Sequence, residues 1–139
     1  MKKLFLFSLL GAFVLVIAAS LSAQSNGCPV RANIPFDFDA GSTHFSAGEY
    51  DVSAIDSQGA LAILGRNSES ALVNSRRAQS SSPSARTKLI FHQYGGSYFL
   101  YQIWVQGEKS GRQLPMTRVE KELASNAIAS PAVVVARNN

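Results

Sequence analysis

The chain has 139 residues, with 13 basic and 9 acidic side chains, and its length is that of a single domain able to bury a core. Lys2 and Lys3 belong to a segment that we expect to be removed, which leaves 11 basic and 9 acidic residues and a net charge of +2. Arg76-Arg77 is the densest basic spot. A net charge of +2 is a weak basic excess, which argues against a nucleic-acid partner.

Residues 1–23 have the organisation of a secretory signal peptide. Two lysines precede an apolar run over 4–19, and the small residues Ser20, Ser22 and Ala23 follow it. The run is shorter than the roughly 20 residues of a membrane span, and no basic cluster follows it. We expect cleavage after Ala23, with Ser20 and Ser22 as alternative sites. The protein would then be exported to the periplasm or the extracellular space, meeting the membrane only through its signal peptide.

Cys28 is the single cysteine, so no disulfide within the chain can frame the fold. Three interpretations remain open: a free thiol in the N-terminal tail, a lipidation site, or a bond to a second chain. We favour the free thiol, because residues 25–27 lack the Leu-like residue that a lipidation site places three positions before its cysteine.

Short apolar runs separated by turns predict an antiparallel all-β meander in the first half of the mature chain. Strict alternation over 30–39 predicts a strand with one buried face. Pro35 places that strand at an edge or directs its position outward, because proline has no N–H for a ladder. The later strands are expected over 44–45, 49–55, 60–64 and 71–76. The Ser-rich segment 79–85 is predicted to be a mobile loop.

The clearest hairpin joins 87–94 to 97–105 through Gly95-Gly96, since glycines supply the positive φ of a tight turn. Its second strand is apolar on both faces, which predicts a central strand covered on both sides. Under strict alternation, one face holds Phe99, Tyr101, Ile103 and Val105, and the other holds Tyr98, Leu100 and Trp104.

The C-terminal part predicts one helix and a last strand over 132–136. Thr117 and Glu120 have the spacing of a capping box. Val119, Leu123 and Ala127 recur at helical spacing, so we expect this stripe to cover the hairpin, with Trp104 under or beside it. Glu120, Glu122, Arg118 and Lys121 are expected on the exposed face. The predicted fold is mainly β: a small antiparallel β-barrel or sandwich of about seven strands with one short C-terminal helix, in a single domain over 24–139.

The candidate chemical groups do not converge in the sequence. His44 and His92 lack metal-ligand spacing with another His, Cys or acid, so we expect no metal. We expect His92 to form a hydrogen bond at the sheet surface and His44 to lie solvated in a loop. Asp37 and Asp39 share a strand face, where solvated side chains are a simpler interpretation than an acid pair. We therefore expect no catalytic residue and no cofactor.

Charges also gather around the start of the helix. Arg112 and Arg118 could hold an anionic ligand at the helix N-terminus, or Arg112, Arg118 and Glu120 could form a salt-bridged clamp that docks the helix. We favour the clamp.

Several segments together resemble a family of small exported bacterial proteins of unknown function. The resemblance rests on 34–38 (IPFDF), 45–50 (FSAGEY), 91–95 (FHQYG), 98–104 (YFLYQIW) and 111–123 (GRQLPMTRVEKEL). It implies export and a single β-rich domain, and it implies no functional residue.

The sequence thus predicts an exported, non-catalytic structural or binding module, possible partners being a second copy of the chain or an envelope protein. The alternative is a small β-barrel that binds an apolar ligand. An interior filled by side chains would favour the first function, and an empty apolar cavity with a polar mouth would favour the second.

Overall fold

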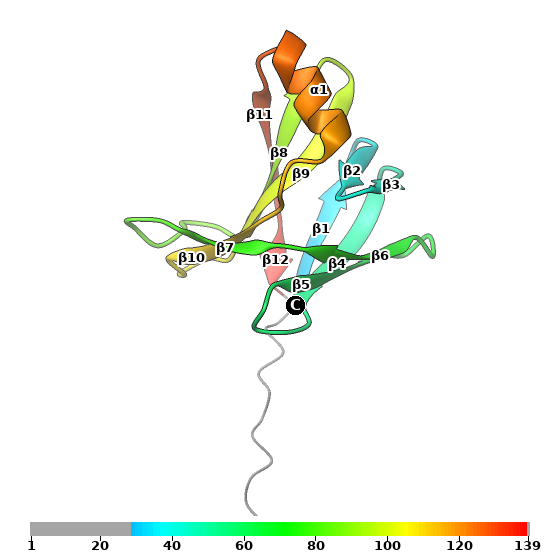
Figure 1. Cartoon of the computed structure of the whole chain (residues 1–139). Helices are drawn as coiled ribbons and strands as arrows, with labels where there is room; N and C mark the ends of the chain where they lie inside the picture. Colours follow the sequence, from blue (N-terminus) through cyan, green and yellow to red (C-terminus); the bar gives the residue numbers. More distant parts are fainter. Residues whose placement is uncertain (1–28, 139) are drawn as a thin grey trace, which may run out of the picture.

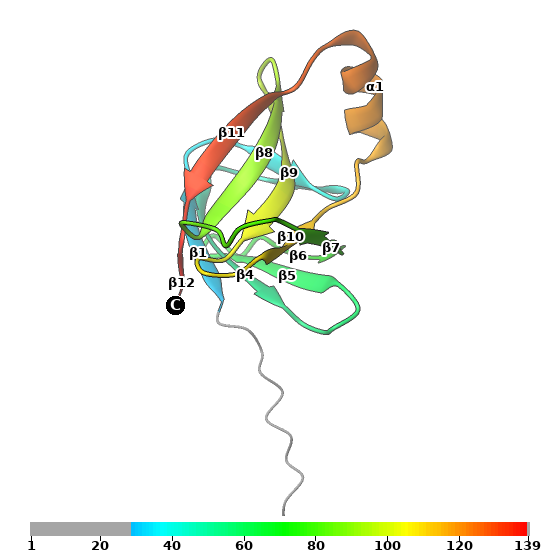
Figure 2. The same cartoon turned by 90° about the vertical axis from the view of Figure 1, so that its left-hand side faces the viewer.

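The computed structural model describes residues 29–138, so the predictions on the signal peptide and Cys28 lie outside the described residues. Two β sheets pack against each other and one helix stands beside them (Figures 1 and 2). In order, sheet A comprises β12 (Arg137–Asn138), β1 (Val30–Ile34), β4 (Gly48–Ala54), β5 (Ala60–Gly65) and β6 (Ser70–Asn74). Sheet B comprises β11 (Ser130–Val135), β8 (Lys88–Tyr94), β9 (Ser97–Trp104), β10 (Ser110–Gln113) and β7 (Arg76–Gln79). β2 (Phe38–Ala40) bridges β9 and pairs with β3 (Thr43–Phe45).

Two bends carry the chain from one sheet to the other. Ser75 separates β6 from β7, and its N–H donates to the Gly59 carbonyl at 2.8 Å. Ala136 separates β11 from β12, and its N–H donates to the Thr87 carbonyl at 2.9 Å. The sheets are not closed into a barrel, so the mainly β prediction is confirmed in its sandwich form. The bends account for part of the difference between the twelve short strands of the described residues and the expected number of about seven.

Aromatic side chains fill the space between the sheets. Phe38, Phe45, Tyr50 and Phe91 are each at most 1% exposed. The rings of Phe38 and Phe45 stack at 5.1 Å, and Phe38 meets Tyr50 and Phe91 edge-on at 5.3 and 5.4 Å. These offset and perpendicular contacts are the arrangements that aromatic rings prefer. The aromatic part of the core therefore joins β2, β3, β4 and β8.

Two predicted strands are interrupted. The alternation over 30–39 forms β1 and β2 with Pro35 in the gap between them. The proline thus ends the strand, and β1 is not an edge because β4 and β12 flank it. The predicted strand 71–76 likewise breaks at Ser75, so Arg76 opens β7 in the other sheet.

The glycine hairpin is confirmed: Tyr94 faces Ser97, and Gly95 adopts a φ of +59°. β9 also has the predicted central place, between β8 and β10.

The prediction of which β9 side chains share a face was wrong for the residues after Tyr101. Ile90 faces Gln102 whereas Phe91 faces Leu100, so Tyr101 is an extra residue in a β-bulge. The bulge shifts the alternation by one residue. Ile103 therefore joins Leu100 in the core, and Trp104 turns to the outer face of sheet B.

The helix α1 (Arg118–Asn126) begins as predicted, with the Thr117 hydroxyl accepting from the Glu120 N–H at 3.2 Å. Its predicted apolar stripe is wrong at two of its three residues, because Val119 is 60% exposed and Ala127 is exposed as well, whereas Leu123 is half-buried. The buried residue of α1 is Glu120. Figure 2 shows α1 beside the turn end of β8 and β9. Trp104 pairs with Lys88 and Gly111 at the other end of β9, so it does not lie under the helix.

The segment 79–85 begins with Gln79, the last residue of β7, and continues into the connection to β8 at the end of an arm that projects from the sandwich (Figure 1). Ser84 is tied to the facing loop, since its N–H donates to the Glu108 carbonyl at 2.9 Å and its carbonyl accepts from the Gly107 N–H at 2.9 Å. The mobility of this loop stays a prediction.

We predict that Gly111→Ala destabilises the fold. An added Cβ would lie 2.6 Å from the Ile103 carbonyl oxygen and 2.8 Å from the Trp104 ring. Overpacking of this kind costs about 1–3 kcal/mol of the free energy of unfolding. Urea denaturation followed by Trp104 fluorescence measures both the loss and the displaced indole. The matched control is Gly96→Ala, where a Cβ meets nothing within 4 Å. Equal stability of the two variants would contradict the packing described.

Candidate functional site

Asp37 and Asp39 each have a local partner. The Asp37 carboxylate accepts from the Ala47 N–H at 2.8 Å, and Asp39 Oδ1 lies 2.8 Å from His44 Nδ1. His44 lies on β3 rather than in a loop, although its side chain is 66% exposed as expected. The arrangement gives two separate surface contacts and no shared acid pair.

Hydrogen bonds among Tyr50, Ser46 and Glu69 anchor one side of the aromatic core. The Tyr50 hydroxyl lies 2.6 Å from both the Ser46 carbonyl oxygen and Glu69 Oε2. The Ser46 N–H and hydroxyl also donate to the Glu69 carboxylate, each at 2.9 Å. The Tyr50 hydrogen bond and these two donors lower the pKa of Glu69 to about 2. Burial, followed by Glu69, raises the pKa of Tyr50 to about 12. Both groups therefore keep their charge states at neutral pH and serve the fold.

A second polar cluster lies between α1 and the outer face of sheet B. Glu120 is 4% exposed, and its Oε1 lies 2.7 Å from His92 Nδ1 and 3.4 Å from the Tyr94 hydroxyl. Tyr101, the bulged residue of β9, stacks on the His92 ring with centroids 3.9 Å apart. Burial and then the Glu120 charge raise the pKa of Tyr94.

This cluster corrects the expectation that Glu120 lies on the exposed face of the helix. The capping-box spacing identifies Glu120 as the third helical residue but does not show which groups its carboxylate contacts. His92 does form a hydrogen bond at the sheet surface, as predicted. The arrangement fastens α1 to β8 through an acid–imidazole contact where an apolar stripe was expected.

Arg112 and Arg118 are not brought together as one site. Arg118 lies on the exposed side of α1, where its Nε is 3.2 Å from Glu122. Arg112 lies on β10, near the turn that contains Gly59. The combined anionic site and the arginine clamp are therefore both wrong, since Glu120 fastens the helix through His92 instead.

A shallow groove of about 310 Å³ lies between the β2–β3 turn and the start of α1. It is lined by Asp39, Gly41, Ser42, Phe99, Thr117, Arg118 and Val119. An acid and a guanidinium thus border a groove that also has two apolar lining residues, Phe99 and Val119. It lies at the surface, apart from the aromatic core.

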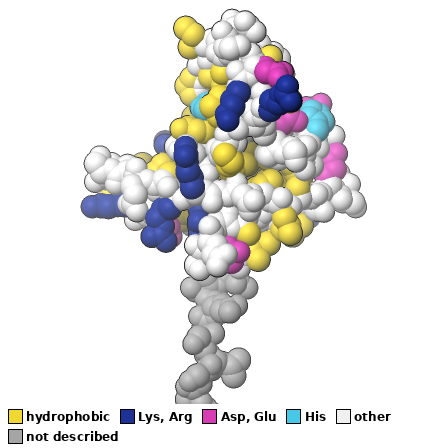
Figure 3. Space-filling model, viewed as in Figure 1, with side chains coloured by type: hydrophobic (Ala, Val, Ile, Leu, Met, Phe, Trp, Pro, Cys, Tyr) yellow, Lys and Arg dark blue, Asp and Glu magenta, His cyan; other side chains and the backbone are white. Residues whose placement is uncertain are grey.

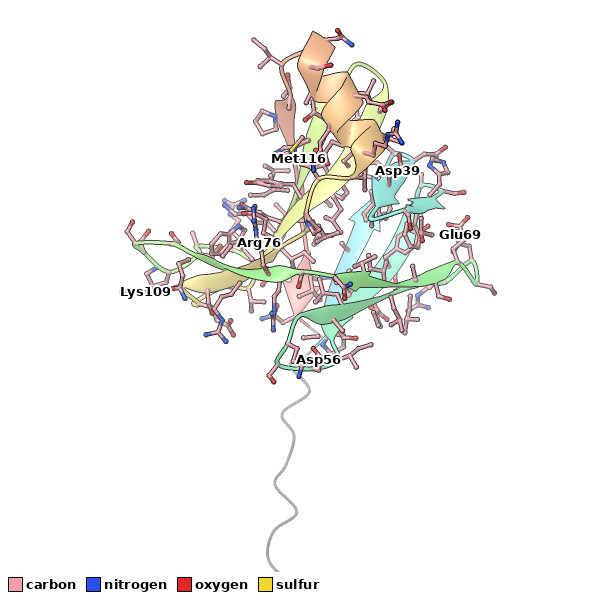
Figure 4. All side chains as sticks on the ribbon, in the orientation of Figure 1. Asp39, Asp56, Glu69, Arg76, Lys109 and Met116 are labelled. Atoms are coloured by element: carbon pink, nitrogen blue, oxygen red, sulfur yellow. The ribbon has the colours of Figure 1, made fainter. Side chains whose placement is uncertain are left out.

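Charge is divided unevenly along the chain. Residues 29–75 carry six acidic and two basic side chains, whereas 76–138 carry nine basic and three acidic ones. The net charges of these parts are therefore −4 and +6. Figure 4 shows Asp39 and Glu69 on one side of the molecule and Arg76 and Lys109 on the other. Dark-blue side chains run from the arm to the helix in the space-filling view (Figure 3).

Within 29–138, no three His, Cys, Asp or Glu side chains form a group that could hold a metal ion. In the same part of the chain, no helix has the length and apolarity to cross a membrane. Comparisons with protein-family models, curated proteins and solved structures gave no match. The resemblance to a family of small exported proteins therefore stays a prediction.

We predict that Glu120→Ala frees the helix from sheet B. The substitution leaves His92 and Tyr94 without their buried acceptor, which costs about 1–3 kcal/mol of the free energy of unfolding. Hydrogen exchange of the α1 amides should speed up far more than that of β8 and β9. Glu122→Ala, on the same helix but with a 66% exposed side chain, is the matched control and should leave exchange nearly unchanged. Slow α1 exchange in Glu120→Ala would contradict the proposed role of the carboxylate.

Proposed function

We propose that the chain is an exported, non-catalytic structural or binding module that acts through its outer surfaces. The observation that carries this proposal is the interior, which the rings of Phe38, Phe45, Tyr50 and Phe91 occupy. A filled interior favours a module that presents surfaces over one that encloses a ligand.

The distribution of polar groups supports the same function. The Glu69 carboxylate binds the buried Tyr50 hydroxyl. The Glu120 carboxylate attaches helix α1 to His92 of β8. Arg31 holds Asp51 through two hydrogen bonds of 2.7 and 3.0 Å across β1 and β4. These groups contribute to the structure of the domain rather than to a convergent reaction centre.

The surface offers regions where a partner could bind. Val133 and Val135 on the edge strand β11 are 55% and 57% exposed, and Leu72 on the edge strand β6 is 73% exposed. Edge strands with unpaired backbone groups are common sites of association between chains. A second copy of the chain or an envelope protein would meet the module there.

The alternative function, an apolar-ligand carrier, has less support. Its expected cavity would lie between the sheets, where the aromatic rings pack. The groove beside α1 lies outside that core and is bordered by the charged side chains Asp39 and Arg118. Export to the periplasm or the extracellular space rests on the signal-peptide pattern of 1–23.

Native mass spectrometry of the full-length product, expressed in and exported from a bacterial host, tests this function. We predict a mature chain that begins near Gln24, carries no lipid on Cys28 and retains no apolar small molecule, alone or bound to a protein partner. A stoichiometric apolar ligand that survives desalting would instead support the carrier. Retention of the uncleaved chain in the cytoplasm would contradict export.

A further inference from the structure

Two arginines face each other across the arm formed by β7 and β10. In the antiparallel register of these strands, Arg77 lies directly opposite Arg112. Directly opposed residues project from the same face with Cβ atoms about 4.5–5.5 Å apart, and like charges in such a pair destabilise the sheet. The arrangement therefore calls for a compensating negative charge.

The described residues supply little of that charge. No carboxylate between residues 29 and 138 forms an ion pair with Arg77 or Arg112. Asp56 is near enough for Arg112 to lower its pKa, but the backbone N–H groups of Ala60 and Gly59 do so more strongly. Its Oδ1 accepts three backbone hydrogen bonds of 2.8–3.0 Å and is thus already engaged in its own turn.

Two neutral donors extend the same face. Gln79 lies two residues beyond Arg77 on β7, and Ser110 lies two residues before Arg112 on β10, so both project on the arginine side. The register places Gln79 directly opposite Ser110. Arg112 and Ser110 are half-buried, which limits their freedom, whereas Arg77 and Gln79 are exposed. The four side chains form a compact group of hydrogen-bond donors, which we call the arm quartet.

We propose that the arm quartet binds a phosphate group, as a phosphate monoester or diester. Guanidinium groups form paired, charge-assisted hydrogen bonds with phosphate oxygens, and the amide and hydroxyl add neutral donors. The net charge of +6 over 76–138 attracts such a partner to this part of the molecule. This inference rests on the proposed function, since it names the partner chemistry of one surface of the module.

Two sources could present this chemistry: a soluble phosphoester or the headgroup of an anionic lipid. The probes are therefore inorganic phosphate, followed by NMR of the ¹⁵N-labelled mature chain, and vesicles of phosphatidylglycerol or of phosphatidylcholine in a sedimentation assay. Sodium chloride at equal ionic strength controls for screening. We expect saturable phosphate shifts centred on the β7 and β10 amides. Phosphatidylglycerol-specific sedimentation would identify a lipid source, and its absence a soluble one.

The variants Arg77→Gln and Arg76→Gln separate a site from net charge. Both remove one positive charge from β7, but Arg76 projects from the opposite face of the strand. Arg77→Gln should weaken phosphate binding about tenfold, the loss of roughly one charge-assisted interaction, while Arg76→Gln should change it less than about twofold. Arg112→Gln, checked for folding by its NMR spectrum, should match Arg77→Gln.

Equal weakening by the Arg77 and Arg76 variants, or phosphate shifts that never saturate, would overturn the proposal. Either result would leave the native mass spectrum of the exported chain unchanged, so this inference and the proposed function fail separately.

Discussion

The contact between the Tyr50 hydroxyl and the Glu69 carboxylate is the constraint on which the arrangement of the core depends. Tyr50 extends from β4 into the aromatic cluster, and its hydroxyl needs a partner once its ring is buried. Glu69 supplies that partner and at the same time binds the Ser46 N–H and hydroxyl at the start of β4. The Glu69 carboxylate thus determines how deeply the Tyr50 ring enters the core, and it holds the segment between β3 and β4 in place. Because Phe38 and Phe45 pack on that ring, their positions follow from it.

Aromatic rings occupy the space between the sheets, which is why the proposed function is assigned to the outer surfaces. The two sheets share the aromatic cluster, and along the chain the acidic residues gather in 29–75 and the basic ones in 76–138. The chain passes from one sheet to the other at Ser75 and Ala136, so both parts of the sequence contribute to the same core. The helix α1 carries two basic and two acidic side chains, and its buried Glu120 holds it against sheet B. The molecule therefore presents Arg76 and Lys109 of the arm on one side and Asp39 and Glu69 on the other.

Local sequence signals predicted the parts of the fold that short-range physics determines. Gly95 predicted the hairpin, and Thr117 predicted the start of the helix, because a positive φ and an N-cap depend on adjacent residues. The bulge at Tyr101 could not be predicted, since it depends on the register of β9 against β8. Its consequence, the exchange of faces by Ile103 and Trp104, was missed for the same reason.

The polar clusters were missed because they join distant segments. Glu120 meets His92 across 28 residues, and Glu69 meets Tyr50 across 19. In the sequence each acid looks like an ordinary surface residue. The opposed pair Arg77 and Arg112 likewise appears only in the strand register, although Arg76-Arg77 was visible as a basic spot. Side chains alternate between the two faces of β7, so Arg77 projects on the same face as Arg112 and Arg76 projects on the other.

A double-mutant cycle on Tyr50 and Glu69, measured by urea unfolding at several pH values, tests the central claim most directly. The pKa of Glu69 is about 2 in the folded chain against an ordinary value of 4.5, so its stabilisation is present above about pH 5 and is lost as the pH falls towards 2. The account predicts that Tyr50→Phe and Glu69→Gln each lower the free energy of unfolding at pH 7. It also predicts that the double variant loses less than the sum of the two, and that Glu69→Gln loses part of the acid dependence. Additive losses, with an acid dependence equal to that of the wild type, would contradict it.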